Sequence, residues 1–424
     1  YRGARAPQTG GHQMNQDDLL LADTNDVLST LRDLFYLPPN TVYLDGNSLG
    51  PLLKRVESRL QKTIREEWGQ DLIASWNSHN WIDLPVKVAE KIAPLVGAAK
   101  GQVICADSVS VNLFKLLVTA LQLNPKRTRV LSVEETFPTD LYMAQGLQKL
   151  LGEARCTLSR VKEASLIEEI NDETNLIMIS HVNFRSGYVN DLKVITETAH
   201  RHGAMVLVDL SHSAGVIPIE LDALGVDFAV GCGYKFLNGG PGAPAFLYVN
   251  QRHQNKVEQP LSGWMGHRSP FEFSADYIPR PGIAQYQSGT PGIIGLSALD
   301  EAMTLWADID IQDVRRKSSA LTSLFIDKVQ NAAELSDLEI VSPLDVETRG
   351  SQVSLSHPDG YEIVQAMIAS GVICDYREPE VLRFGIAPLY NSFEDIIRAV
   401  DLMKDIVKNK RYRDPAFGDR NDVT

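Results

Sequence analysis

Seven short apolar runs, several of them separated by helical patterns, constrain the fold of this chain more than any other feature of its sequence. The runs span residues 103–105, 129–133, 155–159, 176–180, 205–209, 227–231 and 245–249. Apolar residues recur with helical spacing at 110–122, 138–151 and 190–202. Strands that alternate with helices predict an α/β domain whose mostly parallel seven-stranded sheet is flanked by helices.

The segments around this region predict further units. The expected divisions are a flexible tail over residues 1–16, a segment over 17–60 that packs with a small domain, a large domain over 61–300, and a small α+β carboxyl-terminal domain over 301–424. The tail is polar and basic without a hydrophobic centre, so we do not expect a signal peptide. Apolar spacing predicts helices at 17–34 and, as one long linker, at 293–332, whereas the Gly-, Pro- and aromatic-rich stretch 260–292 predicts a functional or interface loop.

Composition excludes several classes of function. The 424 residues carry a net charge of −13, which argues against nucleic acid or an anionic membrane surface as a partner. No apolar stretch approaches the roughly 18 residues that a membrane helix needs. The four cysteines, at positions 105, 156, 232 and 374, lack CxxC spacing. We therefore expect neither a metal site nor disulfides, and a reducing cytoplasm fits best.

Two of the apolar runs carry reactive side chains. The run 205–209 ends in Asp209, with His212 three residues later, and the stretch 227–235 ends in Lys235. In a parallel sheet both ends lie at the same edge. A desolvated lysine is a good Schiff-base nucleophile, and a nearby carboxylate can hold a protonated pyridine nitrogen. The three residues together favour pyridoxal 5′-phosphate (PLP) as cofactor, although each alone also fits an ordinary structural role.

Three further segments offer binding groups. Ser110 could cap the helix expected at 110–122 and leave backbone amides free for an anion, or simply begin that helix. Phe137 could face a cofactor ring or belong to the core. Arg383, in a strand-like apolar run, could bind a carboxylate through two hydrogen bonds or lie on an exposed edge strand.

The segment from Gly46 to Gly50 matches the G-x-S-x-G pattern of the serine-hydrolase nucleophile elbow. That elbow follows a central strand of an α/β sheet, whereas here one expected strand precedes it and Pro51 follows directly. We expect a turn, or a glycine-rich loop near the ligand, instead of a nucleophilic Ser48. The sequence also lacks the glycine patterns of P-loops and of nicotinamide-binding domains.

Taken together, these segments resemble the kynureninase family of fold-type-I PLP enzymes, which are similar to class V aminotransferases. The stretches that carry the resemblance are residues 43–51, 108–112, 135–140, 208–215, 233–242, 263–267 and 382–393. The resemblance implies a hydrolase that cleaves the Cβ–Cγ bond of L-kynurenine to give anthranilate and L-alanine. It also implies a place in tryptophan catabolism by the kynurenine pathway, which feeds NAD biosynthesis.

The resemblance assigns roles to the cofactor residues. Lys235 is implied to form a Schiff base with the cofactor, Asp209 to pair with its pyridine nitrogen, and Phe137 to stack on its ring. Tyr234 is the candidate for proton transfer at Cβ and at the carbonyl group. The other positions that match cofactor-binding residues are Val109, Ser110, Asp140, Ser180, His212, Trp264 and Thr290.

A homodimer with shared active sites is implied as well. Trp264 and Thr290 match positions that reach the phosphate from the neighbouring subunit, and Arg383 matches the residue that holds the substrate carboxylate. The residues expected at the substrate are Arg383, Gly289, Thr290, Asn47 and Ser48. Animal members carry Ser-Asn in place of Gly289-Thr290, so we expect L-kynurenine to be preferred over 3-hydroxykynurenine.

Two alternatives share the cofactor fold. A cysteine desulfurase or selenocysteine lyase needs a nucleophilic cysteine on a carboxyl-terminal loop, whereas here Cys374 precedes that segment and no cysteine follows it. A binding or regulatory module without turnover is opposed by the joint presence of Lys235, Asp209 and Arg383.

Overall fold

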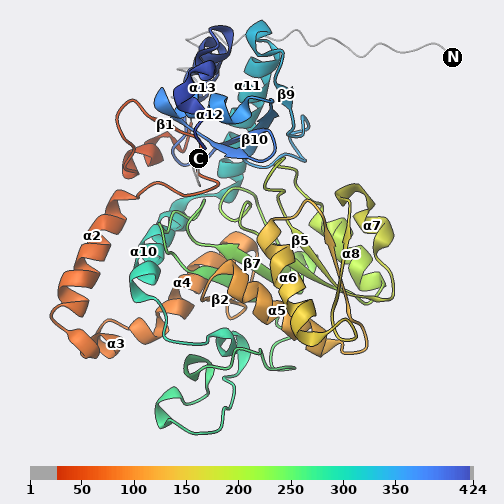
Figure 1. Cartoon of the computed structure of the whole chain (residues 1–424). Helices are drawn as coiled ribbons and strands as arrows, with labels where there is room; N and C mark the ends of the chain where they lie inside the picture. The colour runs from red at the N-terminus through yellow and green to blue at the C-terminus, as the bar shows by residue number, and fades with distance from the viewer. Residues whose placement is uncertain (1–25, 421–424) are drawn as a thin grey trace.

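A seven-stranded sheet forms the centre of the computed structural model, which describes residues 26–420 (Figure 1). Its strands, in the order β2-β8-β7-β6-β5-β3-β4, are β2 (Val103–Cys105), β3 (Arg129–Val133), β4 (Thr157–Val161), β5 (Thr174–Ser180), β6 (Met205–Asp209), β7 (Phe228–Cys232) and β8 (Ala245–Val249). Within this sheet β8 alone runs antiparallel to its neighbours. The predicted mostly parallel seven-stranded sheet is confirmed.

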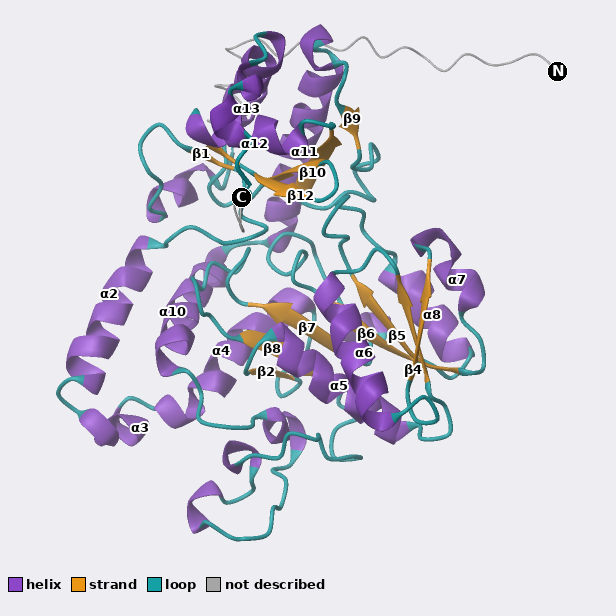
Figure 2. Ribbon diagram, in the orientation of Figure 1, coloured by secondary structure: helices purple, strands orange, loops and turns teal. Residues whose placement is uncertain are grey.

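Helices cover both faces of this sheet (Figure 2). The helices of this part of the chain are α2 (Lys54–Lys62), α3 (Ser75–Ser78), α4 (Leu84–Ile92), α5 (Val109–Leu123), α6 (Pro138–Leu151), α7 (Leu166–Glu169), α8 (Leu192–Arg201), α9 (Leu221–Leu224) and α10 (Ile293–Met303). Of these, α2 and α3 lie away from the sheet, with α2 against α10. Alternate residues of β6 enter two cores: Val206 and Val208 pack with α4, α8 and α10, whereas Met205 and Leu207 pack with α5 and α6. Burial on both faces explains why the strands read as continuous apolar runs.

A second sheet lies in the carboxyl-terminal part of the chain. Its order is β12-β13-β10-β9, with β9 (Glu339–Ile340), β10 (Gln352–Ser356), β12 (Asp375–Arg377) and β13 (Val381–Gly385), and its helices are α11 (Ile311–Gln330), α12 (Gly360–Ala369) and α13 (Phe393–Lys408). These elements share a separate hydrophobic core around Phe325 and Phe384. Early in the chain, β1 (Val42–Tyr43) pairs in parallel with β11 (Val372–Ile373), so the first described segment packs against the last part of the chain. The expected domain boundaries stay predictions.

One sequence prediction of a helix was wrong, and a second is tested only in part. The stretch 293–332 forms α10, a 3-10 turn and α11 instead of one linker helix, because Asp310 caps α11 by accepting a hydrogen bond from Gln312 N at 2.8 Å. Of the helix expected at 17–34, the described part holds a 3-10 helix at Ser29–Leu34, and residues 1–25, with the expected tail, lie outside the described residues. No helix within residues 26–420 has the length and apolar character to span a membrane.

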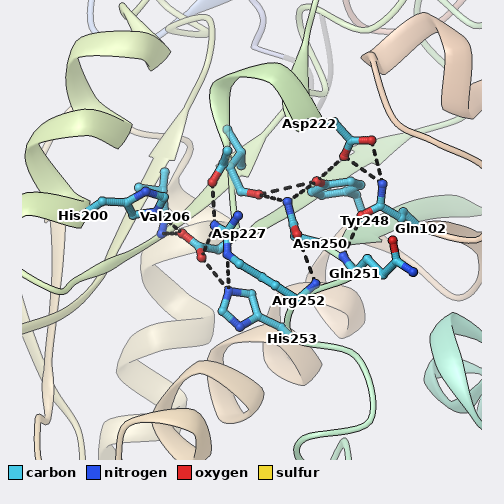
Figure 3. A network of polar contacts seen from close by, with 12 residues as sticks. Gln102, His200, Val206, Asp222, Asp227, Tyr248, Asn250, Gln251, Arg252 and His253 are labelled. Carbon is cyan, nitrogen blue, oxygen red and sulfur yellow. Dashed lines mark hydrogen bonds and ion pairs between the residues drawn. The ribbon is translucent and has the colours of Figure 1, made fainter.

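A polar network occupies the edge of the sheet opposite the carboxyl ends of its parallel strands (Figure 3). Asp227 immediately precedes β7 and is buried. Its Oδ2 binds His200 Nε2 at 2.9 Å and Val206 N at 2.8 Å, and its Oδ1 binds His253 Nε2 and Arg252 Nη2, each at 2.6 Å. Although burial opposes the charge, the contacts with His200, His253 and Arg252 hold the pKa of Asp227 below its usual value.

Candidate active site

A cavity of about 400 Å³ opens where the parallel strands of the large sheet end. Ligand pockets commonly measure roughly 300–1,000 Å³ and lie at the carboxyl ends of such strands. Predicted site residues in its wall are Val109, Ser110, Phe137, Ser180, Asp209, His212, Tyr234 and Lys235. The structure therefore brings together most of the residues that the sequence associates with a cofactor.

Lys235 lies in the cavity wall, but not at the end of a strand. β7 ends at Cys232, and Lys235 follows three residues later in a turn. Its Nζ lies 2.9 Å from Nε2 of His212. Burial lowers the pKa of Lys235 and holds that of His212 well below its usual range, and the positive charge of Lys235 adds to the effect on His212. A lysine with a lowered pKa is a better nucleophile toward an aldehyde.

Asp209 ends β6, as predicted, and one side of its carboxylate is already occupied. Ser211 donates to Oδ1 through its amide at 2.8 Å and through its hydroxyl at 2.6 Å. No hydrogen bond from residues 26–420 reaches Oδ2. Burial raises the pKa of Asp209, so a cationic ring nitrogen beside Oδ2 would offset the cost of the buried charge.

The start of α5 forms another wall of the cavity. Its N-cap is Ser108, whose hydroxyl accepts from Val111 N at 3.4 Å, so the predicted cap at Ser110 was wrong. Val109 and Ser110 occupy the first turn, where backbone amides have no intrahelical partner and point along the positive end of the helix dipole. This geometry suits a phosphate group.

Phe137 directly precedes α6 as its N-cap residue and lines the cavity with its aromatic ring. Its ring centroid lies 5.8 Å from Lys235 Nζ and 5.2 Å from the ring of Phe184, which meets it edge-on. Behind it, Thr136 shares a hydrogen bond of 2.9 Å with the hydroxyl of Ser180. Asp140 is fully buried and does not line the cavity; burial and the charge of Asp209 raise its pKa well above the usual range.

Tyr234 also lines the cavity. Burial, with the neighbouring acids Cys232 and Asp209, raises the pKa of its phenol. The side chain therefore stays protonated at neutral pH and can donate a proton, whereas action as a base would need a nearby cation. Its carbonyl accepts from Gly50 N at 2.8 Å, which joins the loop after β1 to the Lys235 turn.

Arg383 lies in the middle of the small sheet with 2 % of its surface exposed, so the alternative of an exposed edge arginine was wrong. Its Nε donates to Asp375 Oδ1 at 2.8 Å and its Nη2 to Ser48 Oγ at 2.9 Å. Its Nη1 donates to the carbonyl of Phe184 at 2.8 Å. Because Phe184 belongs to the cavity wall, Arg383 lies directly behind that wall.

Asn47 and Ser48 both contact the small sheet. Asn47 Nδ2 donates to Gln352 at 3.2 Å, and its buried Oδ1 has no partner among the described residues. Ser48 donates to Asp375 Oδ2 at 2.7 Å. Ser48 follows β1, which lies outside the large sheet, and its hydroxyl forms no hydrogen bond with a histidine of residues 26–420. The prediction that this segment is not a nucleophile elbow agrees with its place in the fold.

Three further predicted site residues also lie outside the Lys235 cavity. Trp264 is 38 % exposed on the 260–292 loop. Gly289 and Thr290 line a neighbouring cavity of about 180 Å³, which shares Asp107 and Gly242 with the Lys235 cavity. Their place beside the cofactor of another subunit, or beside the substrate ring, stays a prediction.

Sequence reasoning missed Asp375, the main partner of Arg383. The two residues face each other in the antiparallel pair β12–β13. A signal existed, because Glu378-Pro379-Glu380 separates two short strand-like runs and predicts a hairpin, whose register sets Asp375 opposite Arg383. Phe184 and Ser211 were missed too, since their contacts involve a backbone carbonyl and a local turn.

Comparisons with known proteins agree with this geometry. Residues 314–403 match the family model described as Kynureninase C-terminal domain. A kynureninase from Burkholderia pseudomallei (strain 1106a) is 45% identical over 413 residues, which cover 96% of this chain and 99% of that protein. This chain belongs to the kynureninase family. A kynureninase from Pseudomonas fluorescens, with 41% identity over the same shares, is a further relative.

Solved structures show which fold this kynureninase family member has. The apo cysteine desulfurase from Thermococcus onnurineus NA1 superposes with a TM-score of 0.77 at 17% identity, covering 90% of this chain and 98% of that one. The cysteine desulfurase CsdA from Escherichia coli gives 0.76 at 19%, with the same coverage. At such identities the likeness shows the fold alone. Cys374, which precedes the segment where a desulfurase carries its nucleophile, is buried outside the cavity, and burial raises its pKa well above the usual value.

Proposed function

We propose that this chain is a PLP-dependent kynureninase that hydrolyses L-kynurenine to anthranilate and L-alanine. The observation that carries the proposal is the arrangement of Lys235, Asp209 and His212 around one cavity, in a chain 45% identical to a kynureninase over 413 residues. An amine, a buried carboxylate and a neutral imidazole at one sheet edge suit PLP chemistry.

The residues present fit the cofactor. Lys235 would hold its aldehyde, Oδ2 of Asp209 its ring nitrogen, the amides of Val109 and Ser110 its phosphate, and Phe137 one face of its ring. The buried Nδ1 of His212, which has no partner among residues 26–420, is a further polar group that a ligand could satisfy. When bound, PLP supplies an electron sink for charge that develops at the substrate carbons next to the amine.

The proton transfers fall to residues of the cavity wall. Lys235, once free, takes the Cα proton, since its lowered pKa makes the neutral amine available. Asp209 keeps the ring nitrogen protonated. His212 stays neutral, so it can share a proton with Lys235 without adding a second positive charge. Tyr234 would donate a proton to the ketone oxygen as water attacks the ketone carbon and would regain one from that water. It would then give a proton to Cβ as the Cβ–Cγ bond breaks, and the hydroxyl proton of the hydrate would replace it.

The substrate is held from the small sheet. Arg383, which binds the carbonyl of Phe184 in the cavity wall, would bind the α-carboxylate of the substrate. Asn47 and Ser48 would lie beside that carboxylate. Gly289 and Thr290 would lie near the aromatic ring, and their difference from the Ser-Asn of animal members favours L-kynurenine over 3-hydroxykynurenine.

We also propose a homodimer with shared active sites. Three exposed aromatic side chains, Trp264, Phe271 and Phe273, gather on the loop between β8 and α10 with 38 %, 60 % and 78 % of their surface exposed. Exposed aromatic groups of this kind mark interaction surfaces. A cytoplasmic location rests on the four buried cysteines, which form no disulfide.

Anthranilate fluorescence tests the proposed reaction. Purified protein loaded with PLP should release anthranilate from L-kynurenine, at a higher kcat/KM than 3-hydroxyanthranilate from 3-hydroxykynurenine. Release of alanine and sulfide from L-cysteine, without anthranilate from L-kynurenine, would support a desulfurase and overturn the proposal.

A further inference from the structure

One buried carboxylate holds two arginines beside the cavity. Asp375 has 1 % of its surface exposed. Its Oδ1 accepts from Arg383 Nε at 2.8 Å, and its Oδ2 lies 2.7 Å from Arg377 Nη2 and is bound by Arg383 Nη2 as well. Ser48 donates to the same Oδ2 at 2.7 Å. A fork of this kind fixes the plane of a guanidinium group.

The contacts of Arg383 leave it little freedom. A guanidinium has five N–H groups. Four of those of Arg383 are used, two by Asp375, one by Ser48 and one by the Phe184 carbonyl. The fifth, on Nη1, has no partner among the described residues, and it belongs to the nitrogen beside the cavity wall. Asp375 therefore determines where this donor lies.

The charges of both arginines reach the cavity. Burial and closer charges have the largest effects on the pKa values of Lys235 and His212. Arg383 and Arg377 each lower both pKa values further. Arg383 and Arg377 also hold the pKa of Asp375 below its usual value despite burial, so Asp375 stays ionised. An ionised Asp375 is the condition for a fixed guanidinium fork.

We propose that Asp375 is a positioning residue for the substrate carboxylate: it holds Arg383 and Arg377 side by side and fixes the free N–H on Nη1 of Arg383, the nitrogen that binds the carbonyl of Phe184 in the cavity wall. This inference rests on the proposed function, because it takes Arg383 as the group that binds the carboxylate. Asp375 itself does not touch the substrate.

Ligand binding to the PLP-loaded enzyme isolates this role. L-Alanine, a product, carries the carboxylate, and ethylamine is the same molecule without it; the cofactor absorbance reports binding of both. In Asp375→Asn we expect the dissociation constant of L-alanine to rise on the order of 10- to 100-fold, as for the loss of hydrogen bonds between charged groups, while that of ethylamine stays within about twofold. Asp375→Glu, which restores the charge, should recover part of the loss. The same variants should raise KM for L-kynurenine more than they lower kcat.

The controls separate positioning from general damage. Asp227→Asn removes another buried carboxylate that binds an arginine, at the opposite edge of the sheet, and should leave both dissociation constants unchanged. If Asp375→Asn does not fold, Ser48→Ala removes one hydrogen bond each to Asp375, Arg383 and Arg377. It should raise the dissociation constant of L-alanine by a few fold and leave that of ethylamine unchanged. Unchanged or tighter L-alanine binding, or equal weakening of both ligands, overturns the proposal. Wild-type protein that binds L-alanine but releases no anthranilate refutes the proposed reaction separately.

Discussion

The amine nitrogen of Lys235 lies 2.9 Å from Nε2 of His212. Two basic nitrogens at this distance share a single hydrogen bond, so a doubly protonated pair would place two positive charges in contact. Burial lowers the pKa of both groups, which disfavours that state further. The pair therefore carries at most one proton charge, and a neutral amine can react with an aldehyde.

Replacing Lys235 with Ala should abolish steady-state release of anthranilate, because no other described amine lies in the cavity wall. Lys193→Ala removes an exposed lysine of α8 and serves as control, with turnover equal to wild type. The assay follows anthranilate fluorescence under PLP saturation. Multiple turnovers by the Lys235 variant at the wild-type rate would contradict the role assigned to this residue.

Replacing Asp209 with Asn should weaken PLP retention. Asn keeps the shape and the oxygen that Ser211 binds, but loses the charge beside the cofactor nitrogen. A hydrogen bond between charged groups contributes about 1.5–3 kcal/mol, so the dissociation constant of PLP should rise on the order of 10- to 100-fold. Equilibrium dialysis measures it. Asp172→Asn, at an exposed carboxylate paired with His202, should retain PLP like the wild type.

The cofactor end of this site is easier to predict from sequence than the substrate end. Asp209 and Lys235 each follow an apolar run, and parallel strands bring such ends to one edge, so local patterns suffice. The partner of Arg383 depends on the register of an antiparallel hairpin, and Ser48 reaches Asp375 across 327 positions of the chain. No periodicity encodes such contacts. Strand bounds were predicted within two residues for most of the large sheet, because burial on both faces gives continuous apolar runs.

The affinity for L-alanine should depend on pH through Asp45. Burial and the charge of Asp375 raise the pKa of Asp45 to about 7. Above pH 7 the charges of the two acids cancel those of Arg383 and Arg377; below it, protonated Asp45 leaves one excess positive charge. Three further titratable groups feel the charge of Asp45, namely Tyr43, Tyr390 and Cys374; their pKa values are raised, so they stay uncharged in this range.

We therefore expect L-alanine, relative to ethylamine, to bind several-fold tighter at pH 6 than at pH 8, a difference of about 1 kcal/mol. Titrations of the cofactor absorbance at both pH values give this ratio. Asp45→Asn mimics the protonated side chain and should remove the dependence. The affinity of the wild type for L-alanine, divided by its affinity for ethylamine, should thus fall with pH. If this ratio of affinities does not change with pH, or rises, Asp45 does not have this role.

Shared active sites predict complementation between inactive variants. In a mixed dimer of Lys235→Ala and Trp264→Ala chains, one site combines the intact Lys235 of one subunit with the intact Trp264 of the other. Random exchange makes half of the dimers mixed, with one complete site each, so activity should return to about a quarter of wild type. The rate of anthranilate release after refolding the two variants together measures this. If the mixture shows only the summed activity of its parts, or if the wild type sediments as a monomer, sites are not shared.

The Asp227 network predicts an acid-sensitive contribution to stability (Figure 3). The folded pKa of Asp227 lies below its unfolded value of 3.8, so its stabilisation is complete above about pH 4 and is lost as pH falls through the folded pKa. Asp227→Asn leaves His200, His253 and Arg252 without their shared anion. Since Arg252 is partly exposed, we expect the free energy of unfolding to fall by about 2–4 kcal/mol at pH 7, less than for the loss of a fully buried ion pair.

Urea unfolding of wild type and variant at pH 7 and pH 3.5 measures both effects. Wild-type stability should fall toward acid by more than that of Asp227→Asn, so that the difference between the two proteins shrinks. Asp222→Asn provides the control, because the carboxylate of Asp222 binds the neutral donors Gln102 Nε2 and Tyr248 Oη and sits in the same network. Hydrogen bonds from neutral donors depend less on the charge of the acceptor. The free energy of unfolding of Asp222→Asn should therefore fall by about 1 kcal/mol. Equal losses in the two variants would mean that the network stabilises through packing and hydrogen bonds alone, without the charge of Asp227.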